Sequence, residues 1–120
     1  MSKYNYPKIV VTGLGAITPI GNNVEETWNS LIQGKSGAKP ITHFDTTYFE
    51  TKFACEIKGF DPLQYFNRKE VQKMDLFTQY AIASAAMAIE DSGLNLEKED
   101  KDRIGVIVGS GIGGMFVYEQ

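Results

Sequence analysis

The sequence predicts an α/β fold in which helices cover a parallel β-sheet. Two short apolar runs, residues 8–12 and 104–108, lack the alternation of a half-exposed strand. Strands that are buried on both faces, as in a parallel sheet, show this pattern. Segments with helical periodicity lie between the two runs, and strands that alternate with helices are typical of layered α/β proteins.

Each apolar run is followed at once by a glycine turn. Gly13 and Gly15 follow the first run, and the segment 109–114, with the sequence GSGIGG, follows the second. Glycine accepts backbone conformations and close approaches that a side chain forbids, which suits a sharp strand-to-helix turn. Both turns are therefore expected at the ends of buried strands.

Composition narrows the class of protein. The chain has 120 residues, enough for one domain, with 42% hydrophobic residues and a net charge of -3. This charge argues against a nucleic-acid binder, which usually has a basic excess. One cysteine precludes an internal disulfide, and no segment reads as a signal peptide or a membrane helix. We expect a cytoplasmic protein that binds neither nucleic acid nor membrane.

The first half of the chain predicts one helix and one strand. Asn22 or Asn23 can cap a helix over 24–32, whose apolar residues share one face, and Gly34 is a natural stop. The segment 52–58 alternates loosely and reads as a half-buried strand.

The second half predicts mainly helix. Asp61 and the proline after it favour a short helical turn over 62–66. One long helix is expected over 68–92, ended by Gly93, and its stretch 80–89 is apolar nearly all round, as in a buried helix. A further helix is expected to begin at residue 113.

The turn at 109–114 formally matches G-x-G-x-x-G, the dinucleotide-binding fingerprint. Such a turn holds a pyrophosphate on backbone N–H groups at a helix N-terminus. The full fingerprint requires a ribose-binding acid about 20 residues further on, and the sequence ends before that point. An NAD(P)-binding α/β domain is one alternative function, and a non-catalytic interaction module is another.

The two glycine turns, taken with the rest of the chain, resemble the N-terminus of the β-ketoacyl-acyl carrier protein synthases, the condensing enzymes of fatty-acid synthesis. Several further motifs carry the resemblance in order. They are His43-Phe44-Asp45, Lys52-Phe53-Ala54, Arg68-Lys69-Glu70, Lys73-Met74-Asp75, Gln79-Tyr80, Asp91-Ser92-Gly93 and Arg103-Ile104-Gly105. Within the second glycine turn, the apolar residue Ile112 resembles the residue found at this position in the synthase II type.

The resemblance implies a thiolase-like layered fold, of which residues 1–120 would be an incomplete N-terminal domain. It implies a homodimer that needs no cofactor or metal. The reaction would be a decarboxylative Claisen condensation with malonyl-acyl carrier protein, using a cysteine and two histidines. None of these catalytic residues is expected in this chain. Cys55 is interpreted instead as a small buried hydrophobe and His43 as a turn-stabilising residue.

Two groups of residues are candidate sites by the same resemblance. Ile112, with Gly111 beside it, would line the acyl-chain pocket. Arg68, Lys69 and Lys73 would dock the acidic acyl carrier protein by charge complementarity. Gln72 stands where the family commonly has a basic residue, which reduces the charge of this surface.

Overall fold

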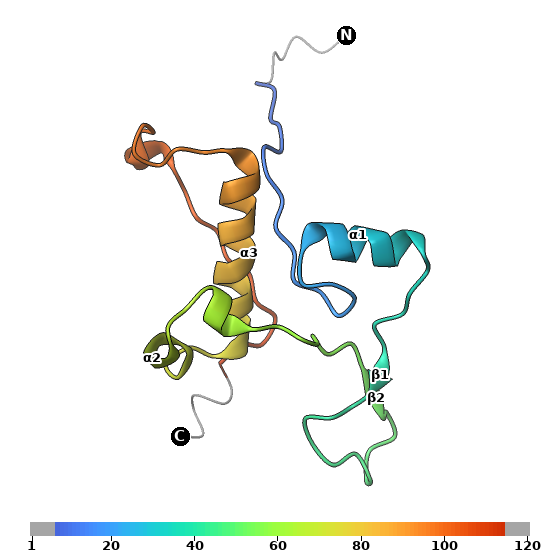
Figure 1. Ribbon diagram of the computed structural model, residues 1–120. Helices are drawn as coiled ribbons and strands as arrows, with labels where there is room; N and C mark the ends of the chain where they lie inside the picture. Colours follow the sequence, from blue (N-terminus) through green and yellow to red (C-terminus); the bar gives the residue numbers. More distant parts are fainter. Residues whose placement is uncertain (1–6, 115–120) are drawn as a thin grey trace.

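The computed structural model describes residues 7–114 (Figure 1). The order of elements along the chain is α1 (Val24–Ile32), β1 (Lys39–Pro40), β2 (Phe53–Ala54), η1 (Pro62–Gln64), α2 (Arg68–Val71), α3 (Leu76–Ser92) and η2 (Lys101–Arg103). Here α denotes an α-helix and η a 3₁₀ turn. The helix expected to begin at residue 113 falls almost entirely outside the described residues.

Helix α1 has the expected bounds and caps. The side chain of Asn23, not Asn22, accepts a hydrogen bond from the Glu26 N–H at 2.7 Å, and Glu26 in turn accepts from the Asn22 N–H at 2.8 Å. Such reciprocal bonds satisfy donors that a helix start leaves unpaired. The chain leaves α1 through Gly34, whose φ of +65° lies in the left-handed region.

A separate turn at residues 18–21, just after the first glycine turn, folds back onto α1. Thr18 and Gly21 form an isolated antiparallel bridge, and the Ser30 hydroxyl donates to the Ile20 carbonyl at 2.8 Å. A Cβ at Gly21 would collide with the backbone of α1. This turn is therefore a structural connection between the N-terminal segment and the helix.

The strand expected over 52–58 is shorter than predicted. β2 spans two residues and pairs antiparallel with β1, in the register Lys39 opposite Ala54 and Pro40 opposite Phe53. One further backbone bond, from the Ile41 N–H to the Lys52 carbonyl at 3.1 Å, continues the pairing beyond Pro40.

The prediction of a single long helix over 68–92 is wrong, because the helix is interrupted between α2 and α3. Asp75 accepts a hydrogen bond from the Leu76 N–H at 2.6 Å and caps α3. Its backbone is extended, with ψ of 156°, which ends the helical geometry between the two helices. An aspartate competes with the helix for backbone donors, and the cap is the outcome here.

The two buried strands expected at 8–12 and 104–108 are also not formed. Both segments are exposed, with Ile9 at 93% and Ile107 at 100% of full exposure, and neither is assigned as a strand. A parallel strand exists only through hydrogen bonds to a neighbouring strand. No strand among the described residues pairs with either segment.

The N-terminal segment instead packs along α3 (Figure 1). A Cβ added at Gly13 would lie 2.7 Å from the Ser92 nitrogen, and one added at Gly15 would lie 2.9 Å from the Ala88 nitrogen. The Leu14 N–H donates to the Asp91 carboxylate at 2.9 Å. These glycines serve close backbone approach to α3, whose small residues Ser84, Ala88 and Ser92 lie at the contact.

The described structure is open. Its radius of gyration is 18.3 Å, whereas a compact domain of this length has about 14 Å. Ala83 is the one hydrophobic side chain that is buried among residues 7–114. The apolar stretch 80–89 of α3 is consequently only partly covered, with Ile82 and Ile89 exposed.

Candidate functional site

The basic face at the start of the second half of the chain is formed and exposed. Arg68 and Lys69 lie in α2, and Lys73 follows in the turn before α3; all three side chains are exposed. These three residues are called the basic face below. No salt bridge within the described residues involves any of them.

Helix α2 has only four residues and is held at both ends. At its start, Asn67 accepts bonds from the N–H groups of Lys69 and Glu70, and Glu70 accepts from the Asn67 N–H at 2.9 Å, a complete capping box. At its end, the side-chain amide of Gln79 donates to the Val71 carbonyl at 3.3 Å and to the Met74 carbonyl at 2.8 Å.

Gln79 is a residue whose role the sequence reasoning missed. It is only 3% exposed, although it is polar. One signal was available in the sequence, because a lone amide directly before an apolar helical stretch needs hydrogen-bond partners when it is buried.

The second glycine turn reaches the first turn of α3. A Cβ at Gly113 would lie 3.0 Å from two ring atoms of Phe77, and 2.9 Å from the Ser110 hydroxyl oxygen. Ile112 is 85% exposed, and a Cβ at Gly111 would meet nothing within 4 Å. The structure thus places both candidate sites at the N-terminal end of α3.

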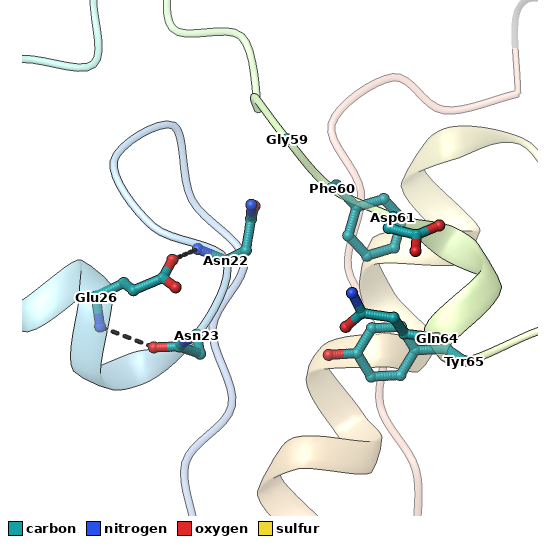
Figure 2. A pocket seen from close by; sticks show the side chains of 8 residues that line it. All are labelled: Asn22, Asn23, Glu26, Gly59, Phe60, Asp61, Gln64 and Tyr65. Atoms are coloured by element: carbon teal, nitrogen blue, oxygen red, sulfur yellow. Dashed lines mark hydrogen bonds between the residues drawn. The ribbon is translucent and has the colours of Figure 1, made fainter.

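A polar cavity of about 230 Å³ lies between the start of α1 and η1. Figure 2 shows Asn23 and Glu26 on one side, joined to the helix start by their capping bonds, with Gln64 and Tyr65 across from them. Residues 7–114 contain no group of three or more His, Cys, Asp or Glu side chains that could hold a metal ion.

Cys55 is exposed, so the prediction of a buried thiol is wrong. It follows the two-residue strand β2 and borders an apolar groove that also includes Pro19, Ile20 and Leu31. The strand was expected to continue past Cys55 and half-bury it; the short ladder leaves it at the surface. No histidine contacts it, since His43 pairs with Glu56.

Glu56 organises the turn that contains His43. Its carboxylate accepts from the Thr42 N–H at 2.9 Å and the Thr42 hydroxyl at 2.8 Å, and it lies 3.7 Å from the His43 Nε2 atom. The two bonds from Thr42 lower the pKa of Glu56, with a smaller contribution from His43. His43 therefore lies in a turn-stabilising cluster.

The described residues thus combine two glycine turns, an exposed basic face and an exposed isoleucine, Ile112, beside the second turn. The chain belongs to the β-ketoacyl synthase family. The family described as "Beta-ketoacyl synthase, N-terminal domain" matches residues 7–120.

Named relatives agree with this assignment. The chain is 53% identical over 112 residues to 3-oxoacyl-[acyl-carrier-protein] synthase 2 of Vibrio cholerae serotype O1, covering 93% of the chain and 27% of that protein. It is 43% identical over 120 residues to the synthase 2 of Synechocystis sp., covering all of the chain and 29% of that protein. The chain therefore spans between a quarter and a third of the length of these curated relatives.

Solved structures confirm the fold class. The ishigamide ketosynthase/chain length factor matches with a TM-score of 0.66 and 43% identity, over 73% of this chain and 22% of that one. A type II polyketide synthase ketosynthase in complex with its acyl-carrier protein matches with a TM-score of 0.57 and 33% identity, over 76% and 23%. The chain therefore has the fold class of the N-terminal part of these thiolase-like α/β ketosynthases.

The comparisons do not favour the nucleotide-binding alternative, since none of these relatives is named for a nucleotide. The geometry also gives it no support. No helix begins at the turn 109–114 within the described residues, so the described part offers no helix N-terminus to a phosphate.

Among the described residues, no helix is long and apolar enough to cross a membrane.

Proposed function

We propose that the complete protein is a 3-oxoacyl-acyl carrier protein synthase of the elongating type, acting in fatty-acid synthesis as a cytoplasmic homodimer. The observation that carries this proposal is the family match over 7–120, together with relatives of 43–53% identity that all bear the synthase 2 name.

The proposed reaction joins two thioesters. An acyl group moves from acyl carrier protein to a cysteine thiol, and the carrier thiol leaves. Malonyl-acyl carrier protein then loses carbon dioxide, and the resulting carbanion attacks the acyl-cysteine carbonyl. A carbon–carbon bond forms, the bond to sulfur breaks, and the cysteine thiolate is released. The family's cysteine and its two histidines have no counterpart in this chain, so it would contribute binding surfaces to the reaction.

We propose two such surfaces. The basic face would dock the acidic acyl carrier protein, and one structural neighbour is a ketosynthase in complex with such a carrier. Ile112 and Gly111 would form part of the wall of the acyl pocket. A branched apolar side chain between glycines, 85% exposed in the described part of the chain, suits a wall that must yield to a long chain.

The reaction is tested with the complete protein, acyl-acyl carrier protein and malonyl-acyl carrier protein. Mass spectrometry should detect a 3-oxoacyl product two carbons longer. The variant Cys55→Ala should retain activity, because Cys55 is exposed and has no histidine partner. Failure of the wild-type protein to form the product, or an inactive but folded Cys55→Ala protein, would overturn the proposal.

The docking surface is tested by charge reversal. Lys69→Glu with Lys73→Glu should raise the KM for carrier-bound substrates about tenfold, and added salt should weaken the wild-type interaction. The matched control is Lys98→Glu with Lys101→Glu, which reverses two exposed lysines beyond the opposite end of α3 (Figure 1). Equal effects of the two double variants would refute a local docking role.

A further inference from the structure

The basic face has little structural support of its own. Helix α2 has four residues, fewer than an isolated helix needs to be stable in water. Its capping box joins Asn67 to Glu70, so these bonds stabilise the turn internally but do not fix where α2 lies. Helix α2 contacts η1, and its position relative to α3 depends on bonds that leave the helix.

The side chain of Gln79 supplies such bonds. It belongs to α3, and its amide group donates to Val71, the last residue of α2, and to Met74 in the connecting turn. The Val71 carbonyl also accepts a long bond from the Met74 N–H at 3.4 Å, and the Gln79 amide is its second donor. Val71 ends α2, where carbonyls begin to lack partners in the helical ladder. Because Gln79 is 3% exposed, water cannot replace it easily at these acceptors.

The same end of α3 also carries the second glycine turn. Phe77 lies two residues before Gln79 and would contact a Cβ at Gly113 at 3.0 Å. The start of α3 is thus a common support for the two proposed binding surfaces.

We propose that Gln79 is a positioning residue for carrier recognition: by bonding to the end of α2 it holds the basic face in the orientation that the carrier protein meets. This inference rests on the docking role proposed above. It predicts that loss of the amide donor changes carrier binding through α2 and leaves the chemistry of bound substrate unaltered.

The test uses Gln79→Met in the complete protein, since methionine keeps the length of the side chain and removes the donor. We expect the KM for malonyl-acyl carrier protein to rise about three- to tenfold with kcat unchanged, as loss of a buried hydrogen bond would give. A malonyl thioester of a short pantetheine-like thiol, which lacks the carrier protein, should show unchanged kinetics. Gln33→Met, at an exposed glutamine after α1, is the matched control.

A double-mutant cycle identifies the route of the effect. When the basic face is already reversed by Lys69→Glu and Lys73→Glu, Gln79→Met should change the carrier KM by less than twofold. Equal losses with carrier-bound and carrier-free substrates, a full effect in the reversed background, or no effect at all would each overturn the proposal. If charge reversal alone leaves the carrier KM unchanged, the docking function itself fails, which is a separate outcome.

Thermal unfolding and circular dichroism of Gln79→Met provide an independent check on folding. If the variant proves too unstable to assay, Gln79→Leu is used instead, because leucine fills much of the same buried space and has no group that can donate to the two carbonyls. The same split between carrier-bound and carrier-free KM is expected, and its absence in Gln79→Leu would overturn the proposal.

Discussion

At the residue scale, Ile112 offers the most direct test of the acyl pocket. Replacing it with phenylalanine enlarges the side chain at the proposed wall, so long acyl chains should be excluded while short ones still fit. Discrimination by a few methylene groups is worth about 10-fold or more in kcat/KM. We expect Ile112→Phe to lower kcat/KM for long-chain acyl carriers at least about tenfold relative to short-chain ones. Unchanged use of long chains would contradict the pocket role.

Glu56 makes a pH-dependent contact at the same scale. Its pKa is lowered from an ordinary value of 4.5, first by the Thr42 N–H and then by the Thr42 hydroxyl. A carboxyl group with a lowered folded-state pKa stabilises the fold above its unfolded pKa, and this contribution is lost as pH falls through the folded value. The two hydrogen bonds from Thr42 to the Glu56 carboxylate should therefore persist at neutral pH. They should be lost below about pH 4.5, when the carboxylate becomes protonated.

Carbon-detected NMR titration of the Glu56 carboxyl group measures this directly. Its midpoint should fall below 4.5, the ordinary value for a glutamate. Thr42→Ala removes the hydroxyl donor and should raise the Glu56 midpoint toward 4.5. A Glu56 midpoint at or above 4.5 in the wild-type protein would contradict the prediction.

The limits of sequence reasoning are also visible in single residues. Helix caps that depend on neighbouring residues alone were predictable. Asn23, Asp61 and Gly93 cap α1, η1 and α3, as their positions in the sequence indicated. Cys55 and Gln79 were not, because the exposure of Cys55 depends on how far β2 extends and the role of Gln79 depends on the break between α2 and α3. A pattern within the chain cannot distinguish an exposed thiol from a buried one when the strand that carries it is two residues long.

At the element scale, the contact between the N-terminal segment and α3 depends on two glycines. A Cβ at Gly15 would overlap the Ser84 carbonyl and approach the Ala88 nitrogen to 2.9 Å. Gly15→Ala should consequently separate the segment from the helix and destabilise the protein by roughly 1–3 kcal/mol, the usual cost of overpacking. Thermal unfolding of the complete protein measures this loss.

Gly105→Ala is the control for that experiment, because a Cβ there meets nothing within 4 Å and its φ is not positive. It should change the midpoint of unfolding far less than Gly15→Ala. Similar shifts for the two variants would show that loss of glycine flexibility, and not the close approach to α3, is responsible.

The break between α2 and α3 shows what an element-scale prediction lacks. Apolar periodicity continues from Val71 through Met74 into Phe77, which is why one helix was expected. Asp75 overrides that periodicity, since its side chain bonds to the Leu76 N–H and its backbone leaves the helical region. An aspartate at a possible N-cap inside a periodic segment is a signal that can outweigh the period.

At the scale of the whole molecule, the α/β fold class was predictable from the sequence. The parallel sheet expected from segments 8–12 and 104–108 is not formed among the described residues. The segments 8–12 and 104–108 have the composition of buried parallel strands, and the ketosynthase neighbours confirm the α/β class. A strand nevertheless needs a neighbouring strand along its whole length, and no strand among residues 7–114 pairs with either segment. Pattern alone identifies a strand's character but not the neighbour that completes it.

The exposure of these segments leads to a last prediction, about the 120-residue chain by itself. Two extended apolar segments with unpaired backbone groups, and an apolar helix that is only partly covered, form a surface that favours association. We expect the purified chain to self-associate in analytical ultracentrifugation and to bind a dye specific for exposed apolar surface. Val10→Lys with Ile107→Lys should reduce both signals, whereas Tyr48→Lys, at an equally exposed side chain outside these segments, should reduce them much less. A wild-type chain that is monomeric and unfolds cooperatively would contradict this prediction, because such a chain would have to bury the surface that the described residues leave open.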